Sequence, residues 1–337
     1  MLKKFLLLLF VLLILLTFTA CQANHQSSQQ QVGLKKRKLV IAEQYGLAYA
    51  PIQLIKVKKM LENAEPGLEI EWKQLSNTAA IREAMLAGRV DIGFMAIPPF
   101  LIARDKGMDW QIITGLAHCP LALMSNQSAV NSLADLKPEN RIALPQPGSI
   151  QHILLTMAAQ KEFGQADLFD NQLLTMSHPD AMNALLAGHE VTAHFSSPPY
   201  LFKESKIEGI KSILTGQAAF GGDFTFIVGV SKSNFYQENP QLYQVFMQTL
   251  QKAVAELSHN PAQAAKNLAA VYDLNQQELL TYLTWPGMKY SQDVQGLKRF
   301  ADFMTFQGYL TSNNFKVGNL VKTNSIFKII GETEGND

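Results

Sequence analysis

Short apolar runs alternate with helical patterns along most of the chain. Apolar runs of four or five residues bounded by polar positions are typical of strands, and the longer stretches between them favour helices. The predicted strands lie at 39–42, 68–72, 90–94 and 112–116, and the predicted helices at 51–61 and 78–87. Alternation of strands and helices predicts parallel βαβ units and an α/β fold.

One helix–strand–helix pattern occurs twice, one hundred residues apart. The sequence AMLAG at 84–88 recurs as ALLAG at 184–188, and PPFL at 98–101 recurs as PPYL at 198–201. From the first alanine to the last leucine, seven of the eighteen aligned positions are identical, where average composition predicts about one. Each copy predicts a helix closed by a glycine, then a strand, then a diproline that opens a new helix. Two copies this far apart indicate two similar lobes rather than a solenoid.

Further segments of the chain, from about 40 to 310, resemble the type II periplasmic-type solute-binding proteins. These segments are 39–61, AGRVDIG at 87–93, PGS at 147–149 before a predicted helix at 150–163, and the asparagine-proline pairs at 239–240 and 260–261. They resemble, in that order, the opening strand and helix of the family, its small-Gly-x-x-Asp-x-Gly signature, its Gly-Ser-Thr turn and the starts of its carboxy-terminal helices. The nearest groups are the sulfonate, taurine and nitrate binders and their thiamine-precursor-binding relatives.

The resemblance implies a two-lobed α/β fold in which each lobe is a mostly parallel sheet flanked by helices. The implied boundaries are lobe one at 39–123 and, as a helical second part, 225–320, lobe two at 124–224, and a C-terminal tail at 321–337. Two crossing segments near 122–126 and 221–226 are expected to form a hinge, because the diglycine Gly221-Gly222 gives the second one backbone freedom.

The ligand site is expected between the lobes. In a parallel sheet, ligands bind outside the carboxyl ends of the strands, where helix amino termini present free N–H groups and a positive dipole end. The candidates from lobe one are Gln44, Tyr45, Tyr49, Asn77, Thr78, Ala96, Ile97 and Pro98. The candidates from lobe two are Gly148, Ser149, Ile150, Ser196 and Ser197.

Several of these residues have two possible roles. Thr78 and Ser149 stand where a hydroxyl either caps a helix or contacts a ligand. Tyr45 and Tyr49 either line the cleft or pack at a strand end. His194 is interpreted as structural, and a position in the cleft would instead make ligand capture pH-sensitive.

The candidate turns contain no lysine or arginine, which argues against a highly charged ligand. A hydrogen bond to a charged group contributes about 1.5–3 kcal/mol, so four or five backbone donors suffice for a monoanion. The apolar Ile97 and Ile150 leave room for a small heterocycle as the alternative.

The amino terminus predicts export and a lipid anchor. Lys3 and Lys4 precede an unbroken apolar run at 5–16, which is too short to span a bilayer and fits a signal peptide at 1–20. The sequence FTAC ending at Cys21 resembles the lipobox of bacterial lipoproteins, whose cysteine is lipid-modified, as with palmitate. The alternative is an ordinary signal peptide followed by a chance cysteine. Residues 21–38 read as a tether whose final basic cluster either meets anionic headgroups or is a solvated charge run.

Composition excludes several other classes of protein. Lysine plus arginine is 29 and aspartate plus glutamate is 28, so the near-neutral chain lacks the charge that drives nucleic-acid binding. The two cysteines exclude a disulfide scaffold, and Cys119 is expected to be a small buried hydrophobe. The seven histidines form no zinc motif, and no nucleophile elbow, phosphate loop or dinucleotide fingerprint is found, so neither a metal, a cofactor nor a catalytic residue is expected.

These observations favour a binding protein over an enzyme. The hypothesis is a monomeric lipoprotein on the extracytoplasmic face of the cell membrane that captures a small solute by hinge closure. An ABC permease and ATPase are partners implied by the resemblance. The solute is expected to be monoanionic or polar, like a sulfonate, taurine or nitrate, and the alternative is a thiamine-type pyrimidine precursor. An enzyme of the same fold and a binding lipoprotein coupled to a membrane sensor are the competing classes.

Overall fold

The computed structural model describes residues 38–311, 317–322 and 328–330. They belong to one unit, Lys35–Asp337. The signal peptide, Cys21 and almost all of the predicted tether lie outside the described residues, as does most of the C-terminal tail. No helix in the described ranges combines the length and the apolar character needed to cross a bilayer.

The first sheet has six strands in the order β11-β4-β10-β3-β1-β2. Its strands are β1 (Lys38–Glu43), β2 (Glu69–Gln74), β3 (Ile92–Ala96), β4 (Trp110–His118), β10 (Ile227–Lys232) and β11 (Lys289–Tyr290). Strand β1 pairs in parallel with β2 and β3, while β10 is antiparallel to both β3 and β4. Strands β1 to β4 therefore run in one direction, and β10 is inserted between two of them in the opposite direction.

The second sheet follows the same plan with five strands in the order β7-β6-β8-β5-β9. Its strands are β5 (Ala122–Ser125), β6 (Ile142–Leu144), β7 (Leu173–Thr175), β8 (Ala193–Ser196) and β9 (Lys211–Thr215). Strand β6 is parallel to β7 and β8, whereas β5 is antiparallel to β8 and β9. Most strands of each sheet thus run in one direction, as expected. Many neighbouring pairs are nevertheless antiparallel, because a reversed strand lies between two strands of the common direction. Two of the reversed strands, β5 and β10, are those that the chain forms directly after passing from one sheet to the other, and β11 is also antiparallel to its neighbour β4.

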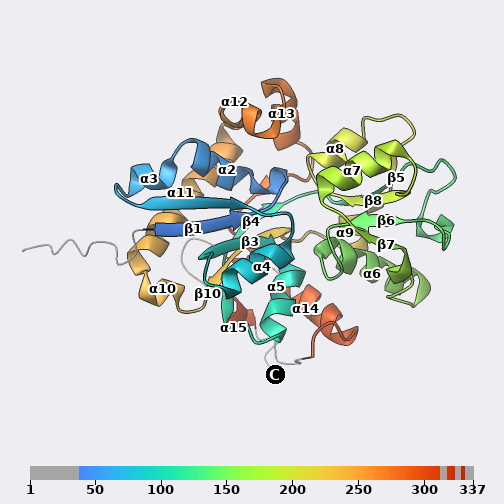
Figure 1. The fold of residues 1–337 in the computed structure, drawn as a ribbon, viewed down its shortest axis with the longest axis horizontal. Helices are drawn as coiled ribbons and strands as arrows, with labels where there is room; N and C mark the ends of the chain where they lie inside the picture. The colour runs from blue at the N-terminus through green and yellow to red at the C-terminus, as the bar shows by residue number, and fades with distance from the viewer. Residues whose placement is uncertain (1–37, 312–316, 323–327, 331–337) are drawn as a thin grey trace, which may run out of the picture. The chain divides into compact units, whose positions relative to one another are not determined.

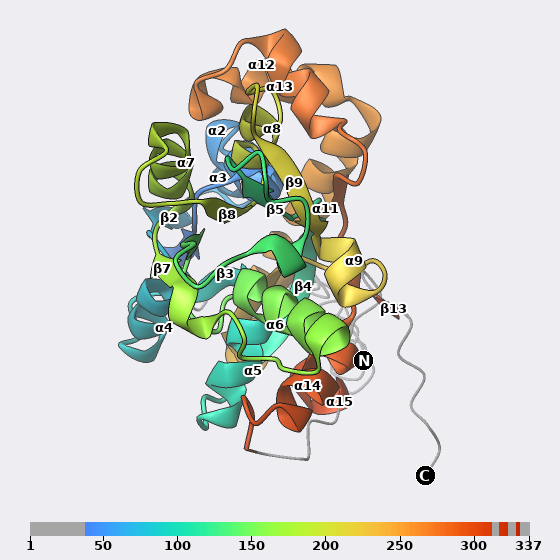
Figure 2. The same cartoon turned by 90° about the vertical axis from the view of Figure 1, so that its right-hand side faces the viewer.

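Helices cover both faces of each sheet. The helices between and after the strands of the first sheet are α2 (Ala50–Val57), α3 (Met60–Ala64), α4 (Thr78–Leu86), α5 (Ile97–Asp105), α10 (Phe235–Glu238), α11 (Pro240–His259), α12 (Pro261–Tyr272), α13 (Gln276–Leu283), α14 (Leu297–Phe306) and α15 (Val317–Leu320). The second sheet carries α6 (Ile150–Phe163), α7 (His178–Ala187), α8 (Tyr200–Glu204) and α9 (Gly216–Phe220). In Figures 1 and 2, α2 and α3 lie on one side of the first sheet and α4 and α5 on the other, while α7 and α8 lie opposite α6 on the second sheet.

Short elements complete the chain. The described residues include 3-10 helices at η1 (Leu47–Tyr49), η2 (Leu133–Asp135) and η3 (Asp170–Gln172). Strands β12 (Val294–Gln295) and β13 (Ile329–Ile330) form a parallel pair, and Val321 bridges to Ile112 of β4. The described part of the segment expected to be a tail therefore pairs with the fold.

The repeated sequence forms the repeated structure that its pattern predicts. Gly88 and Gly188 follow α4 and α7 with φ of 67° and 73°, the left-handed conformation that glycine adopts at lowest cost. A strand and a further helix follow in both copies. The helix expected at 51–61 is instead divided into α2 and α3, because Lys59 takes a left-handed φ of 49°.

The core between the first sheet and α11 is aliphatic and aromatic. Helix α11 buries Leu242, Phe246 and Leu250 at the spacing of one helical face, and the rings of Phe246 and Phe94 lie 6.4 Å apart. Cys119 is buried and free, as expected for a small hydrophobe, and burial raises the pKa of its thiol.

Candidate functional site

A small cavity lies where the strand ends of the two sheets face each other. Gln44 follows β1 and Ala96 ends β3, while Ser197 follows β8 of the second sheet. The cavity encloses about 30 Å³. This is room for about two waters, since each needs roughly 10–15 Å³. Known ligand pockets have volumes of about 300–1,000 Å³, so admitting a solute requires the walls to separate.

Eight of the thirteen predicted residues line this cavity. They are Gln44, Tyr45, Tyr49, Thr78 and Ala96 from the first part of the chain, and Ser149, Ile150 and Ser197 from the second-sheet region. Both sets come from turns that follow strands. The structure thus brings together residues that lie up to 153 positions apart, from Gln44 to Ser197.

Helix amino termini converge on the cavity. Ala96 and Ser149 are the N-caps of α5 and α6, and Thr78 and His178 are the first residues of α4 and α7. Each of these four helices therefore directs its positive dipole end, and N–H groups that no helical carbonyl accepts, toward the same space. Such an arrangement suits a solute that offers acceptor oxygens or a single negative charge.

Of the two hydroxyls expected either to cap a helix or to contact a ligand, that of Ser149 is a cap and that of Thr78 is not. Ser149 caps α6 by accepting a hydrogen bond from the backbone N–H of His152 at 3.3 Å. Asn77, not Thr78, caps α4, because its Oδ1 accepts from the N–H of Ala80 at 3.0 Å. Thr78 Oγ1 accepts instead from Gln44 Nε2 at 3.1 Å.

Ser197 also contributes a hydroxyl to the cavity. It lies on the cavity wall, 2% exposed, and no side-chain hydrogen bond from the described residues engages its Oγ. Tyr45 and Tyr49 both line the cavity, but Tyr45 is 42% exposed whereas Tyr49 is buried. Burial, and secondarily the charge of Glu43, raises the pKa of the Tyr49 phenol, so this hydroxyl stays protonated.

Five predicted residues do not line the cavity: Asn77, Ile97, Pro98, Gly148 and Ser196. Asn77 is occupied as a cap, and the Gly148 N–H donates to His152 Nδ1 at 3.0 Å. Ile97 and Pro98 are buried in the first turn of α5. Ser196 ends β8, so its side chain points to the sheet face opposite that of Phe195. Its Oγ is buried and has no hydrogen-bond partner among the described residues.

The sequence analysis did not predict six residues of the cavity wall: Pro99, Pro145, Gln151, His178, Phe226 and Ile227. Gln151 and His178 belong to the first turns of α6 and α7, so the helix-start rule would have reached them if it had been extended by a turn. Phe226 and Ile227 have no such signal. They enter because β10 runs opposite to its neighbours, which places its amino end beside the carboxyl end of β3.

The cavity wall carries no formal charge at neutral pH. No lysine, arginine, aspartate or glutamate is among the described lining residues. Burial, and then the nearby His194, holds the pKa of His178 well below its usual range, so its imidazole is neutral. Glu43 lies one residue before Gln44, and burial raises the pKa of its carboxyl to about 8, with Lys56 opposing the shift.

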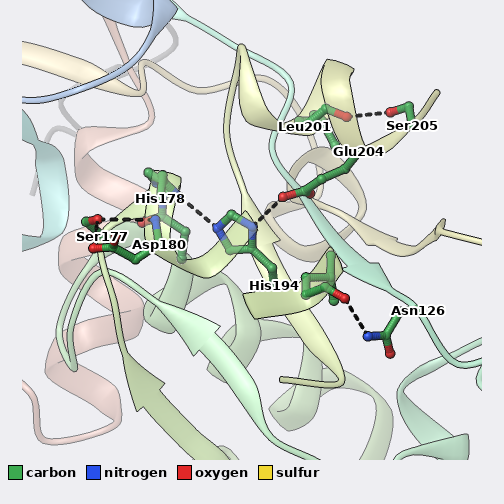
Figure 3. Close-up of polar contacts among 10 residues, drawn as sticks. Asn126, Ser177, His178, Asp180, His194, Leu201, Glu204 and Ser205 are labelled. Atoms are coloured by element: carbon green, nitrogen blue, oxygen red, sulfur yellow. Dashed lines mark hydrogen bonds and ion pairs between the residues drawn. The ribbon is translucent and has the colours of Figure 1, made fainter. Parts of the chain in front are cut away.

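His194 has the structural position preferred by the sequence analysis. It is fully buried in β8 and is not part of the cavity wall. Its Nδ1 lies 2.6 Å from Glu204 Oε1 and its Nε2 lies 2.9 Å from His178 Nδ1 (Figure 3). His178 itself lines the cavity, so His194 is one contact removed from any solute.

Metal-type clusters are not found in the described ranges: no group of three or more histidine, cysteine, aspartate or glutamate side chains is arranged to hold an ion. The cavity wall offers hydroxyls, amides, one imidazole and three aromatic rings. These groups can donate and accept hydrogen bonds.

Comparison with a protein-family model finds a match described as NMT1/THI5 like over residues 62–264. No match is found among curated proteins.

Three solved structures share the fold. The alkanesulfonate-binding protein SsuA of Xanthomonas axonopodis pv. citri, bound to MOPS, has a TM-score of 0.70 and 24% identity over 84% of this chain and 98% of its own. The periplasmic aliphatic sulphonate-binding protein SsuA of Escherichia coli has a TM-score of 0.66 and 21% identity over 85% and 97%. The periplasmic nitrate-binding protein NrtA of Synechocystis PCC 6803 has 0.64 and 11% over 84% of each. The predicted α/β fold of the type II periplasmic binding proteins is confirmed.

Proposed function

The chain belongs to the NMT1/THI5-like family, and on that premise we propose that it is an extracytoplasmic solute-binding protein of an ABC-type importer. The observation that carries this proposal is the cavity between the two sheets, where four helix amino termini meet and no ionised side chain intrudes. Structural neighbours named as sulfonate- and nitrate-binding proteins support a transport role. The wall has the donors to hold a solute and lacks a catalytic cluster, so binding without chemistry is proposed.

The solute proposed first is a small monoanion or polar molecule of the sulfonate, taurine or nitrate kind. Hydrogen bonds to a charged acceptor contribute about 1.5–3 kcal/mol each, so several N–H donors and the Ser197 hydroxyl replace a missing cation. A small heterocycle of the thiamine-pyrimidine kind is the second candidate. It is favoured by the rings of Tyr45, Tyr49 and Phe226, which offer flat apolar faces on the same wall.

Capture is proposed to occur by hinge closure between lobes divided at about 123 and 224. Contacts between the two regions surround the cavity: the Leu47 N–H donates to the Pro198 carbonyl at 2.9 Å, and the Ala79 N–H to Gln146 Oε1 at 3.3 Å. Movement of the two regions apart would break these bonds and widen the cavity. Closure then converts solute contacts into a shape that a permease distinguishes from the open form.

Attachment to the membrane through Cys21 belongs to the same proposal. A lipid-anchored monomer would stay close to the permease and ATPase that complete an importer. A Cys21→Ser variant should move the protein from the membrane to the soluble fraction, as followed by fractionation and immunoblotting. Persistent membrane association of this variant would contradict lipidation and leave the solute-binding proposal untouched.

The solute proposal is tested by calorimetric titration with taurine, methanesulfonate, nitrate and 4-amino-2-methylpyrimidine. One of them should bind saturably with one site per chain. The Ser149→Ala, Ser197→Ala double variant should bind it at least about tenfold more weakly, because both hydroxyls line the cavity. Ser128→Ala, an exposed serine outside the cavity, is the matched control and should bind as the wild type does. Equal affinity of the double variant and the control would remove both serines from the site.

A further inference from the structure

A row of four side chains begins at the cavity wall and ends at the fully buried carboxyl group of Glu204. Gln151 Nε2 lies 3.1 Å from His178 Nε2, His178 Nδ1 lies 2.9 Å from His194 Nε2, and His194 Nδ1 lies 2.6 Å from Glu204 Oε1. Figure 3 shows the two histidine rings and Glu204 in a row between α7 and α8. His194 and Glu204 are 0% exposed, whereas Gln151 and His178 line the cavity.

The hydrogens in this row must all point the same way. If Glu204 is ionised it only accepts, so His194 carries its proton on Nδ1 and its Nε2 accepts from His178 Nδ1. A neutral imidazole has one N–H, so His178 Nε2 then accepts from the amide of Gln151. In this state the Gln151 carbonyl oxygen, which receives no hydrogen bond from a described side chain, is the atom offered to a solute.

One added proton reverses the whole row. With a proton on Glu204, or with His194 doubly protonated beside it, His194 Nε2 donates to His178 Nδ1. His178 then carries its proton on Nε2 and donates to Gln151, which must turn its amide and present the NH₂ group to the cavity. The low pKa of His178 makes this a change of tautomer there rather than of charge.

We propose that Gln151, His178, His194 and Glu204 form a proton-linked relay that sets the hydrogen-bond polarity of the cavity at Gln151. Gln151 is the specificity-determining residue, and the other three are positioning residues that act through it. The relay resting on an ionised Glu204 selects solutes that donate a hydrogen bond. The relay with one more proton selects acceptors such as anions, so capture of an acceptor takes up one proton.

Other ionisable groups near the relay are few. On α7 Asp180 accepts a hydrogen bond from Ser177, and on α8 Tyr200 stacks on His178 with ring centroids 5.9 Å apart. Lys203 neighbours Glu204 in sequence, and Lys206 is held by Glu278 and Tyr282. Strands β5 and β6, which flank His194, contain no titratable side chain.

The empty protein tests the relay without any solute. Histidine labelled with ¹⁵N reports by NMR which ring nitrogen carries the proton. Across the pH range in which the protein stays folded, the proton of His178 should move from Nδ1 on the alkaline side to Nε2 on the acid side, and His194 should gain a proton on Nε2 in the same step. The step should be absent in Glu204→Gln, which has no acid to titrate. Glu43→Gln, the same substitution at a buried glutamate outside the relay, should retain it. A wild type in which either histidine keeps one tautomer over this range would overturn the proposal, whether or not Glu204→Gln folds.

The consequence for selectivity rests on the proposed function and has its own readout. Methanesulfonate presents only acceptors, whereas methanesulfonamide of the same size presents an NH₂ donor. Above the midpoint of the step, methanesulfonate affinity should fall about tenfold per pH unit, since one proton must be taken from solution. Methanesulfonamide affinity should not fall over the same range, and the pH dependence of methanesulfonate affinity should vanish in Glu204→Gln. A pH-independent methanesulfonate affinity in the wild type would contradict proton coupling. Failure of both probes to bind would reject this solute class, while the tautomer measurement would still decide the relay.

Discussion

The two copies of the repeat have the same backbone plan but different chemistry. At positions one hundred apart, the first copy has Thr78, Phe94 and Arg104 where the second has His178, His194 and Glu204. Phe94 packs in the core against Phe246, whereas His194 joins a buried polar row. The comparison shows that duplicated geometry brings two helix starts to the cavity, while only the second copy connects its helix start to an ionisable interior.

The turns after β3 and β8 also differ in chemistry, because the second copy is again the more polar one. The first copy places Ala96 and Pro99 on the cavity wall, and the second places Ser197 there. The first copy thus presents apolar side chains at this turn, and the second presents a hydroxyl. Substitutions that make one copy resemble the other should therefore have unequal effects.

The largest effect is expected from His194→Phe, which gives the second copy the residue of the first. The change removes the hydrogen-bond partner of the fully buried Glu204. Breaking a buried pair on one side costs about 3–5 kcal/mol, so the free energy of unfolding in urea should fall by about this amount. Adding Glu204→Leu should recover more than about 1 kcal/mol, since no unpaired carboxyl then remains. Unchanged urea unfolding of the single variant would show that the row contributes no stability.

A second comparison concerns two buried glutamates, Glu43 of β1 and Glu204 of α8. Glu204 is paired with a histidine, whereas Glu43 is paired with an amide. Glu43 is 1% exposed and accepts a hydrogen bond from the Gln53 amide at 2.5 Å, and burial raises its pKa from 4.5 to about 8. Between these pH values the folded state holds a proton that the unfolded state has lost. Stability should therefore decrease as pH rises from about 4.5 toward 8, by up to about 1.4 kcal/mol per unit.

Glu43→Gln should remove this part of the pH dependence, as measured by urea unfolding at a series of pH values. Glu69→Gln makes the same substitution at an exposed position on β2 and should leave the slope unchanged. Parallel pH profiles for the wild type and Glu43→Gln would mean that Glu43 is ionised in the folded protein.

The smallest effects are expected where the two copies have the same role. Asn77 and Ser177 are aligned N-caps, accepting from the N–H groups of Ala80 at 3.0 Å and Asp180 at 3.4 Å. Replacing either cap with alanine should cost about 0.5–2 kcal/mol. Thermal unfolding should show losses of similar size for Asn77→Ala and Ser177→Ala. A loss confined to one of them would break the equivalence of the two helix starts.

Local features of the fold were predictable because they depend on neighbouring residues. The helix at 150–163 was predicted with the bounds that α6 has, since Ser149 supplies the cap and Gly164 the left-handed end. The paired glycines were predicted because a glycine readily takes the left-handed conformation at a helix end. The asparagine-proline starts of α11 and α12 were expected from the family resemblance, and neither asparagine caps its helix through its side chain. The division of α2 from α3 was not predicted, because Lys59 adopts a conformation that lysine rarely favours.

The sequence alone therefore determined the α/β alternation, the duplication and most of the helix starts that surround the cavity. Only the tertiary structure decided that β10 enters the first sheet in reverse and brings Phe226 and Ile227 to the cavity wall. It also decided that His178, His194 and Glu204 lie in one row. Capping and turn conformations are settled within a few residues, whereas strand insertion and side-chain rows depend on long-range packing that no local pattern encodes.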